Sequence, residues 1–239
     1  MVDGGPVVGS SRAPLPPWMR WVGPLLAGLV LIAGAELVVY NLAGGGAAPA
    51  PARRPAAVVS GAPVGAGTLP EGPVPVDVLG LRFELPAGWF VSAPGASVDG
   101  VGLFPGDERL ASAFDRNLAI AVESGAVLFG FDTEPGADAL LQVVLFPTDA
   151  GDPLLAATEA GRTTFASTAG VTIERDEPVD LAEGTGHRFR YRFMDGTVEA
   201  IGIQLLVPAD GQVFVVTFST DDPAIASELD DVAATVSAG

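Results

Sequence analysis

The sequence predicts an α+β domain, an antiparallel β-sheet flanked by helices, preceded by one transmembrane helix. Three observations lead to this prediction. One long apolar run lies near the start of the chain. From residue 80 onward, short runs rich in Val, Ile, Leu and Phe are separated by Gly, Pro or Asp, and three longer segments repeat their apolar residues at helical spacing. The chain of 239 residues therefore divides into an apolar N-terminal part and one folded domain.

The apolar run extends from Trp21 to Tyr40 and contains one charged residue, Glu36. A helix of this length spans about 30 Å at 1.5 Å per residue, which is the thickness of the hydrocarbon core of a bilayer. Trp18, Trp21 and Tyr40 lie where aromatic belts are expected at the two interfaces. We therefore predict a transmembrane helix over residues 21–42. The Glu36 carboxylate is expected to reach the headgroups, and contact with a partner helix is the alternative.

A cleaved signal peptide is the competing interpretation, because residues 33–35 have the small-residue form of a cleavage site. The apolar run continues through residues 37–39, which suits a retained anchor better. Arginines flank the run on both sides, and Arg20 directly abuts it. The positive-inside rule then makes residues 1–20 a short cytoplasmic tail. We expect a single-pass protein of the cell membrane with its C-terminal domain outside the cytoplasm.

Residues 43–76 are mostly Ala, Gly or Pro and offer almost nothing that a core could bury, so we predict a linker. As a flexible coil it reaches roughly 30 Å, which tethers the folded domain but leaves it mobile. Its one basic pair, Arg53 and Arg54, is expected to be solvated, and contact with lipid headgroups is the alternative. Residues 77–239 then form the folded domain.

The charge of the chain is strongly negative, and all 12 of its basic residues are arginine. Four of these arginines, but only Asp3 and Glu36 of the 29 acidic residues, precede residue 71. The net charge of −17 for the whole chain therefore becomes about −19 for the folded part, which repels nucleic acid and anionic headgroups. We predict no nucleic-acid partner.

Few catalytic groups are available in this sequence. Cysteine is absent, which excludes disulfides, thiolate zinc sites and cysteine nucleophiles, and the absence of lysine excludes a GxxxxGK[ST] phosphate-binding loop. His187 is the single histidine, so a Ser-His-Asp relay could pass only through it. We expect His187 to be an ordinary strand residue and predict neither an enzyme nor a bound cofactor.

Carboxylates alone could hold a metal ion. Asp132, Glu134 and Asp138 in one loop, and Asp221 with Asp222 in another, offer oxygen ligands for Ca²⁺. Neither group has the spacing of an EF-hand, so solvated acidic loops are expected instead and no metal ligand is predicted.

Strand patterns and helix patterns alternate along the folded part. The strand patterns cover residues 80–85, 89–92, 126–132, 139–146, 171–180, 186–194, 197–207 and 212–219. The helix patterns cover residues 107–124, 153–168 and 223–237. The last two begin with Asp-Pro, in which the aspartate can cap the first free amides and proline suits the first helical position.

The predicted strand 186–194 places Arg188, Arg190 and Arg192 on one face and three aromatic residues on the other. A two-residue turn at Asp195-Gly196 would set Arg192 opposite Glu199 on the next strand.

On the preceding strand, a loop near Glu183 would set Arg192 opposite Glu174 and Arg190 opposite Asp176. We therefore expect arginines neutralised by flanking carboxylates. Arg188 would face Pro178 and Ile203, which carry no carboxylate. The alternative prediction is a ligand or partner site formed by Arg188, Arg190 and Arg192.

Two stretches carry a resemblance to a known family. LRFELPAGWF at residues 81–90 resembles the opening hairpin of the PsbP-like fold, which includes LpqN-type bacterial lipoproteins, and residues 211–238 are similar to its last strand and closing helix. The resemblance covers residues 77–238. It implies an α/β/α sandwich and roles as accessory or docking subunits, and it transfers no catalytic residue. This chain lacks the lipid-bearing cysteine of the LpqN type, so we expect its transmembrane helix to take over the anchoring.

These observations favour a membrane-tethered accessory domain outside the cytoplasm, which acts through contacts with an unknown protein partner and has no evident catalysis. A small-molecule or Ca²⁺ binding module of the cell envelope, using a cleft beside the sheet, is the alternative. An enzyme is the third candidate.

Overall fold

The computed structural model describes residues 72–93, 99–134, 139–146, 151–182, 184–195 and 198–238. The predicted cytoplasmic tail and transmembrane helix, and the linker up to residue 71, lie outside these residues. Within the described part of the chain, no helix is long and apolar enough to cross a membrane.

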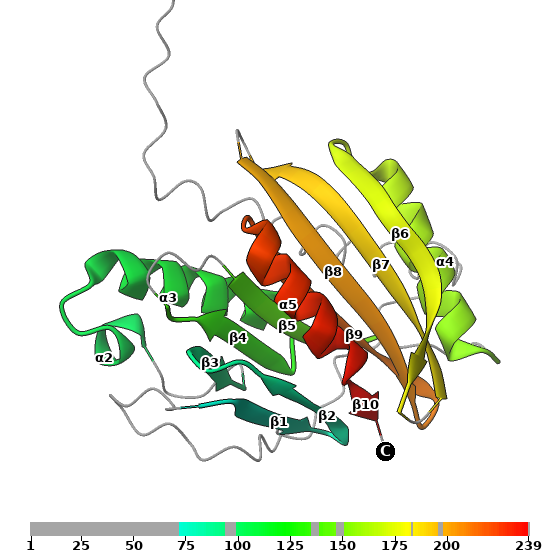
Figure 1. The fold of residues 1–239 in the computed structure, drawn as a ribbon, viewed down its shortest axis with the longest axis horizontal. Helices are drawn as coiled ribbons and strands as arrows, with labels where there is room; N and C mark the ends of the chain where they lie inside the picture. The colour runs from blue at the N-terminus through cyan, green and yellow to red at the C-terminus, as the bar shows by residue number, and fades with distance from the viewer. Residues whose placement is uncertain are drawn as a thin grey trace, which may run out of the picture.

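Two antiparallel sheets form the domain (Figure 1). The larger sheet has the strand order β3-β4-β5-β9-β8-β7-β6. Its strands are β3 (Trp89–Ser92), β4 (Leu128–Asp132), β5 (Ala139–Phe146), β6 (Val171–Leu181), β7 (Gly184–Asp195), β8 (Val198–Ala209) and β9 (Gln212–Thr220). The smaller sheet has the order β1-β2-β10, with β1 (Val74–Val78), β2 (Leu81–Leu85) and β10 (Ser237–Ala238).

Helices lie on both faces of the larger sheet (Figure 1). They are α2 (Gly100–Leu103), α3 (Glu108–Glu123), α4 (Pro153–Ser167) and α5 (Pro223–Ala234). Helix α5 and the small sheet bury one apolar cluster against β5, β8 and β9. Helix α4 covers a second cluster on β7, β8 and β9, and α3 with α2 covers a third on β4 and β5. The predicted α+β fold class, with an antiparallel sheet between helices, is confirmed.

The three longer helices begin as the sequence predicts. A side-chain oxygen of Asp107 accepts a hydrogen bond from the amide of Leu110 at 3.0 Å. Asp152 and Asp222 cap α4 and α5 in the same way, and proline occupies the first turn of both helices. These caps satisfy amides that would otherwise lack partners at a helix start.

Three short elements were not predicted. Strand β1 begins at Val74, within the Pro-rich stretch that reads as linker. Strand β10 occupies Ser237–Ala238, where the helical pattern was expected to continue, and pairs with β2. Helix α2 is a single turn that pairs with α3. Helix α2 and strand β10 are too short for hydrophobic periodicity to show, and the prolines at residues 73 and 75 make β1 resemble the linker before it.

Candidate functional site: a charge ladder on strand β7

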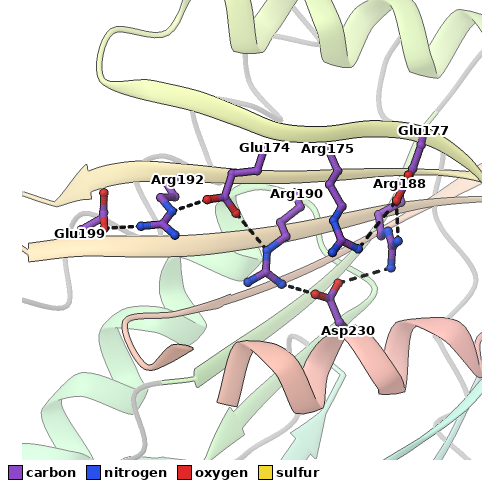
Figure 2. Close-up of polar contacts among 8 residues, drawn as sticks. All are labelled: Glu174, Arg175, Glu177, Arg188, Arg190, Arg192, Glu199 and Asp230. Carbon is purple, nitrogen blue, oxygen red and sulfur yellow. Dashed lines mark hydrogen bonds and ion pairs between the residues drawn. The ribbon is translucent and has the colours of Figure 1, made fainter. Parts of the chain in front are cut away.

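Strand β7 lies between β6 and β8 and presents its arginines on the face of the sheet that carries α5 (Figure 2). The other face carries Phe189, Tyr191 and Phe193, which are 0%, 1% and 3% exposed beneath α4. The predicted division of this strand into an arginine face and an aromatic face is therefore correct.

Arg192 lies between two carboxylates. Its Nη1 is 2.8 Å from Oε2 of Glu199, and its Nε donates to Oε1 of Glu174. Both partners were predicted, but the predicted register was wrong. Arg192 lies opposite Ile201, because Asp195 pairs with Val198, whereas the predicted turn would have paired Met194 with Thr197. A shift of two positions keeps the same face, so Arg192 still reaches Glu199 diagonally.

Arg190 joins the ladder to helix α5. Its Nε is 3.1 Å from Oε2 of Glu174, and its Nη1 donates to Oδ2 of Asp230. The prediction that Arg190 faces Asp176 was wrong, because β6 has a bulge between Ile173 and Arg175. One extra residue reverses which face each later side chain occupies, so Asp176 lies beneath α4.

Arg188 also has carboxylate partners, and the prediction that it has none was wrong. Its Nη2 is 2.5 Å from Oε1 of Glu177, which lies opposite it on β6, and its Nη1 is 3.5 Å from Oδ1 of Asp230. The Nε of Arg188 is buried without a hydrogen-bond partner. Arg175 extends the ladder, with Nη1 3.9 Å from Oε1 of Glu177.

The ladder is electrically balanced. It joins four arginines to four carboxylates, Arg175, Arg188, Arg190 and Arg192 with Glu174, Glu177, Glu199 and Asp230 (Figure 2). Burial alone would raise the pKa of Glu174, but the hydrogen bonds from Arg192 and Arg190, with the attraction of their positive charges, outweigh burial and lower it. The hydrogen bond from Arg188 likewise lowers the pKa of Glu177. Glu174 and Glu177 therefore stay ionised at neutral pH and act as counter-ions for the arginines.

A second polar cluster lies beneath α4. His187 Nε2 is 2.7 Å from Oδ1 of Asp176, and both oxygens of Asp176 accept hydrogen bonds at 2.8 Å from Arg162 of α4. Arg162 also bonds Glu159 at 2.8 Å. The hydrogen bond from Arg162, followed by that from His187, lowers the pKa of Asp176. His187 is a buried strand residue, as predicted, but its link to Asp176 depends on the β6 bulge and was missed.

In the two acidic loops considered for Ca²⁺, the Asp132 and Asp222 carboxylates accept hydrogen bonds from backbone amides of the domain. Asp132 Oδ1 accepts a hydrogen bond from the amide of Glu134 at 2.9 Å, and Asp222 caps α5. Burial raises the pKa of Asp132 to about 6. Asp138 lies outside the described residues. Among the residues that are described, no three acidic or histidine side chains are arranged to hold a metal ion.

Two hollows flank α5 on this face. A groove of about 830 Å³ lies between the β1–β2 hairpin and α5, and we call it the α5 groove; its lining is Pro73, Pro75, Val76, Asp77, Arg82, Phe83, Glu84, Leu85, Pro86, Glu228, Asp231, Val232, Thr235 and Ser237. A smaller pocket of about 230 Å³ adjoins Arg188 and is lined by Val179, Leu181, Leu205 and Ala233, among others.

Comparison with known proteins shows similarity of fold only. No protein-family model matches the chain, and no curated protein matches it. Among solved structures, the chain is similar to cyanobacterial PsbP (CyanoP) from Synechocystis sp. PCC 6803, at 15% identity over 67% of this chain and 87% of that one, with a TM-score of 0.44. It is also similar to LpqN of Mycobacterium tuberculosis, a protein involved in cell envelope biogenesis, at 12% identity over 72% and 88% of the two chains, with a TM-score of 0.41.

The immunity protein TplEi of Pseudomonas aeruginosa is similar over 46% of this chain and 43% of its own, at 12% identity and a TM-score of 0.36. PsbP and LpqN are the two groups named by the resemblance of residues 81–90 and 211–238. At these identities no catalytic or binding residue is transferred from any of these proteins to this chain.

Proposed function

We propose that the chain is a single-pass, membrane-anchored accessory domain that lies outside the cytoplasm and acts through protein contacts. The observation that carries this proposal is the balance of charges within the domain. Arg82, Arg162 and the four arginines of the ladder each have a carboxylate of the same domain within 3.9 Å. Most of the positive charge is therefore neutralised within the domain, and the remaining carboxylates make its surface negative.

Such a surface selects its partner by charge. A negative domain attracts a cationic protein surface and repels nucleic acid and anionic lipid, and this attraction raises the association rate more than the final affinity. The apolar run Trp21–Tyr40 supports anchoring, and the Ala/Gly/Pro-rich linker supports a domain that samples a volume near its membrane. A tether of this kind raises the local concentration of a weak docking module.

Crosslinking of the full-length chain in its own cells, followed by mass spectrometry, tests the proposal. We expect one reproducible partner with a cationic surface. When the crosslinking is repeated in a cell lysate, recovery of this partner should fall as the salt concentration rises. Recovery of bulk membrane proteins alone, or of a partner whose capture is insensitive to salt, would contradict the proposal.

Arg188 favours a second candidate function. Its Nε is buried and unpartnered, and it adjoins the pocket lined by Val179, Leu181 and Leu205. A small ligand with an apolar body and an anionic group would fit this chemistry, in line with the predicted site at Arg188, Arg190 and Arg192. Such a ligand would have to compete with Glu177 and Asp230 for the guanidinium of Arg188. The site therefore stays a prediction, which measurements of anion binding would test.

A further inference from the structure

We infer that the α5 groove is the docking site of the chain's own segment 43–71, with Arg53 and Arg54 lying against its acidic rim. The docking needs neither a membrane nor a partner protein, so it stands apart from the proposed function. Its consequence for the reach of the domain does rest on the anchoring proposed above.

The place where the chain enters the domain supports this occupant. Pro73 and Pro75 line the α5 groove, and Gly72 is the first described residue. The described part of the chain therefore begins beside the groove. Only 17 residues separate Arg54 from Gly72, and a flexible coil of that length spans roughly 25 Å. The arginine pair can thus turn back onto the groove without leaving its neighbourhood.

The charge of the groove complements this segment. Its rim carries Asp77, Glu84, Glu228 and Asp231 against one arginine, Arg82. Arg82 already bonds Asp77, with Nε 3.3 Å from Oδ2.

Among the ion pairs of the described residues, none includes Glu84, Glu228 or Asp231. Three unpaired carboxylates thus line one groove. Arg53 and Arg54 are the basic residues nearest to the groove along the chain on its N-terminal side.

The apolar part of the groove suits a segment of this composition. Pro73, Pro75 and Pro86 contribute rigid apolar surface, and Phe83 and Val232 lie beneath them, each 7% exposed. The segment between Arg54 and Gly72 consists mainly of Pro, Ala, Val and Gly. Proline-containing segments lose little conformational entropy when they lie extended in a shallow groove. A short tether holds the segment at millimolar effective concentration, so even weak contacts keep it docked.

Docking shortens the tether. When the segment from Arg53 onward lies in the groove, only residues 43–52 of the linker stay free, and the domain sits nearer to the start of the chain. A cationic partner that takes the groove would displace Arg53 and Arg54 and lengthen the tether. The groove therefore couples partner binding to the distance that the domain can reach.

Disulfide trapping in the purified full-length chain tests the inference, because the natural chain has no cysteine. The test variant combines Ala56→Cys, next to the arginine pair, with Thr235→Cys, an exposed residue of the groove. The matched control combines Ala56→Cys with Ala166→Cys, an exposed position on α4 at the other face of the sheet. Because the chain enters the domain beside the groove, an undocked tether would also reach residue 235 sooner than residue 166, so the deciding comparison is this ratio of rates with and without Arg53 and Arg54.

We expect the disulfide at residue 235 to form at least about tenfold faster than the disulfide at residue 166. Replacing Arg53 and Arg54 by Gln should slow it about three- to tenfold, since each exposed ion pair contributes modestly. Replacing Arg12 and Arg20 by Gln removes the same charge elsewhere and should leave the rate unchanged.

Equal rates at residues 235 and 166, or a rate at residue 235 that the loss of Arg53 and Arg54 leaves unchanged, would overturn the inference. A disulfide that joins two chains would also overturn it, since the groove would then hold the segment of a second copy. Where Thr235→Cys disturbs the end of α5, Glu84→Cys on β2 provides a second groove position with the same expected outcome.

Discussion

Asp230 is the residue of helix α5 that forms ion pairs with the charge ladder. The variant Asp230→Asn shows how much these ion pairs contribute to the free energy of unfolding. The Asp230 carboxylate contacts Arg188 and Arg190, and the three side chains are 17%, 17% and 15% exposed. Removing one partner of a fully buried ion pair costs about 3–5 kcal/mol, whereas an exposed pair contributes about 0.2–1 kcal/mol. Because these groups are about five-sixths buried, we expect Asp230→Asn to lower the free energy of unfolding by about 2 kcal/mol.

Equilibrium unfolding in urea, followed by circular dichroism, gives this free energy. Glu199→Gln is the matched control, because it makes the same change of charge and shape at the exposed end of the ladder, where Glu199 and Arg192 are 54% and 46% exposed. Its expected cost is about 0.2–0.5 kcal/mol. A double-mutant cycle of Asp230→Asn with Arg190→Gln should give a coupling of about 1 kcal/mol or more. Equal costs for Asp230→Asn and Glu199→Gln would refute the reasoning.

Three further predictions use the same unfolding assay. Acid should destabilise the domain, because Glu174 and Asp176 have lowered pKa values in the folded state; the stability they contribute is present above about pH 4 and is lost as the pH falls through those lowered values. A free energy of unfolding that stays constant between about pH 5 and about pH 2 would contradict this prediction. Asp132→Asn should stabilise the domain by about 1–2 kcal/mol at pH 7.5 and by little at pH 4, because the pKa of Asp132 is raised to about 6 and the charged form is penalised as the pH rises through that value; an equal effect at both pH values would exclude this cause. Gly202→Ala should cost about 1–3 kcal/mol, since its Cβ would lie 2.2 Å from the ring of Tyr191, while the control Gly151→Ala meets no atom within 4 Å and should be close to neutral.

Local patterns were sufficient to predict most of the fold. The Asp-Pro pairs at residues 152–153 and 222–223 fixed two helix starts, because capping and the fixed φ of proline act within one turn. The alternation in residues 186–194 correctly separated the arginine face of β7 from its aromatic face, because the side-chain period of a strand depends only on its own backbone.

The candidate site could be predicted only in part, because it depends on contacts between distant segments. The bulge at Glu174 reverses the faces of β6, and no residue in that strand marks it. As a result, Asp176 contacts His187 and not Arg190, its predicted partner, and Glu177 lies opposite Arg188. Asp230 reaches the ladder from a helix about 40 residues further along the chain, and strand pairing carries no information about the docking of that helix.

The most direct test of the central claim is to replace Arg188, Arg190 and Arg192 together by Gln, and to measure both the free energy of unfolding and the binding of sulfate to the wild type and the variant. If the three arginines are counter-ions for their own domain, the variant should lose at least about 2 kcal/mol of stability, and the wild type should show no saturable sulfate binding. Saturable sulfate binding by the wild type, lost in a variant of unchanged stability, would contradict the account and assign the arginines to an anionic ligand.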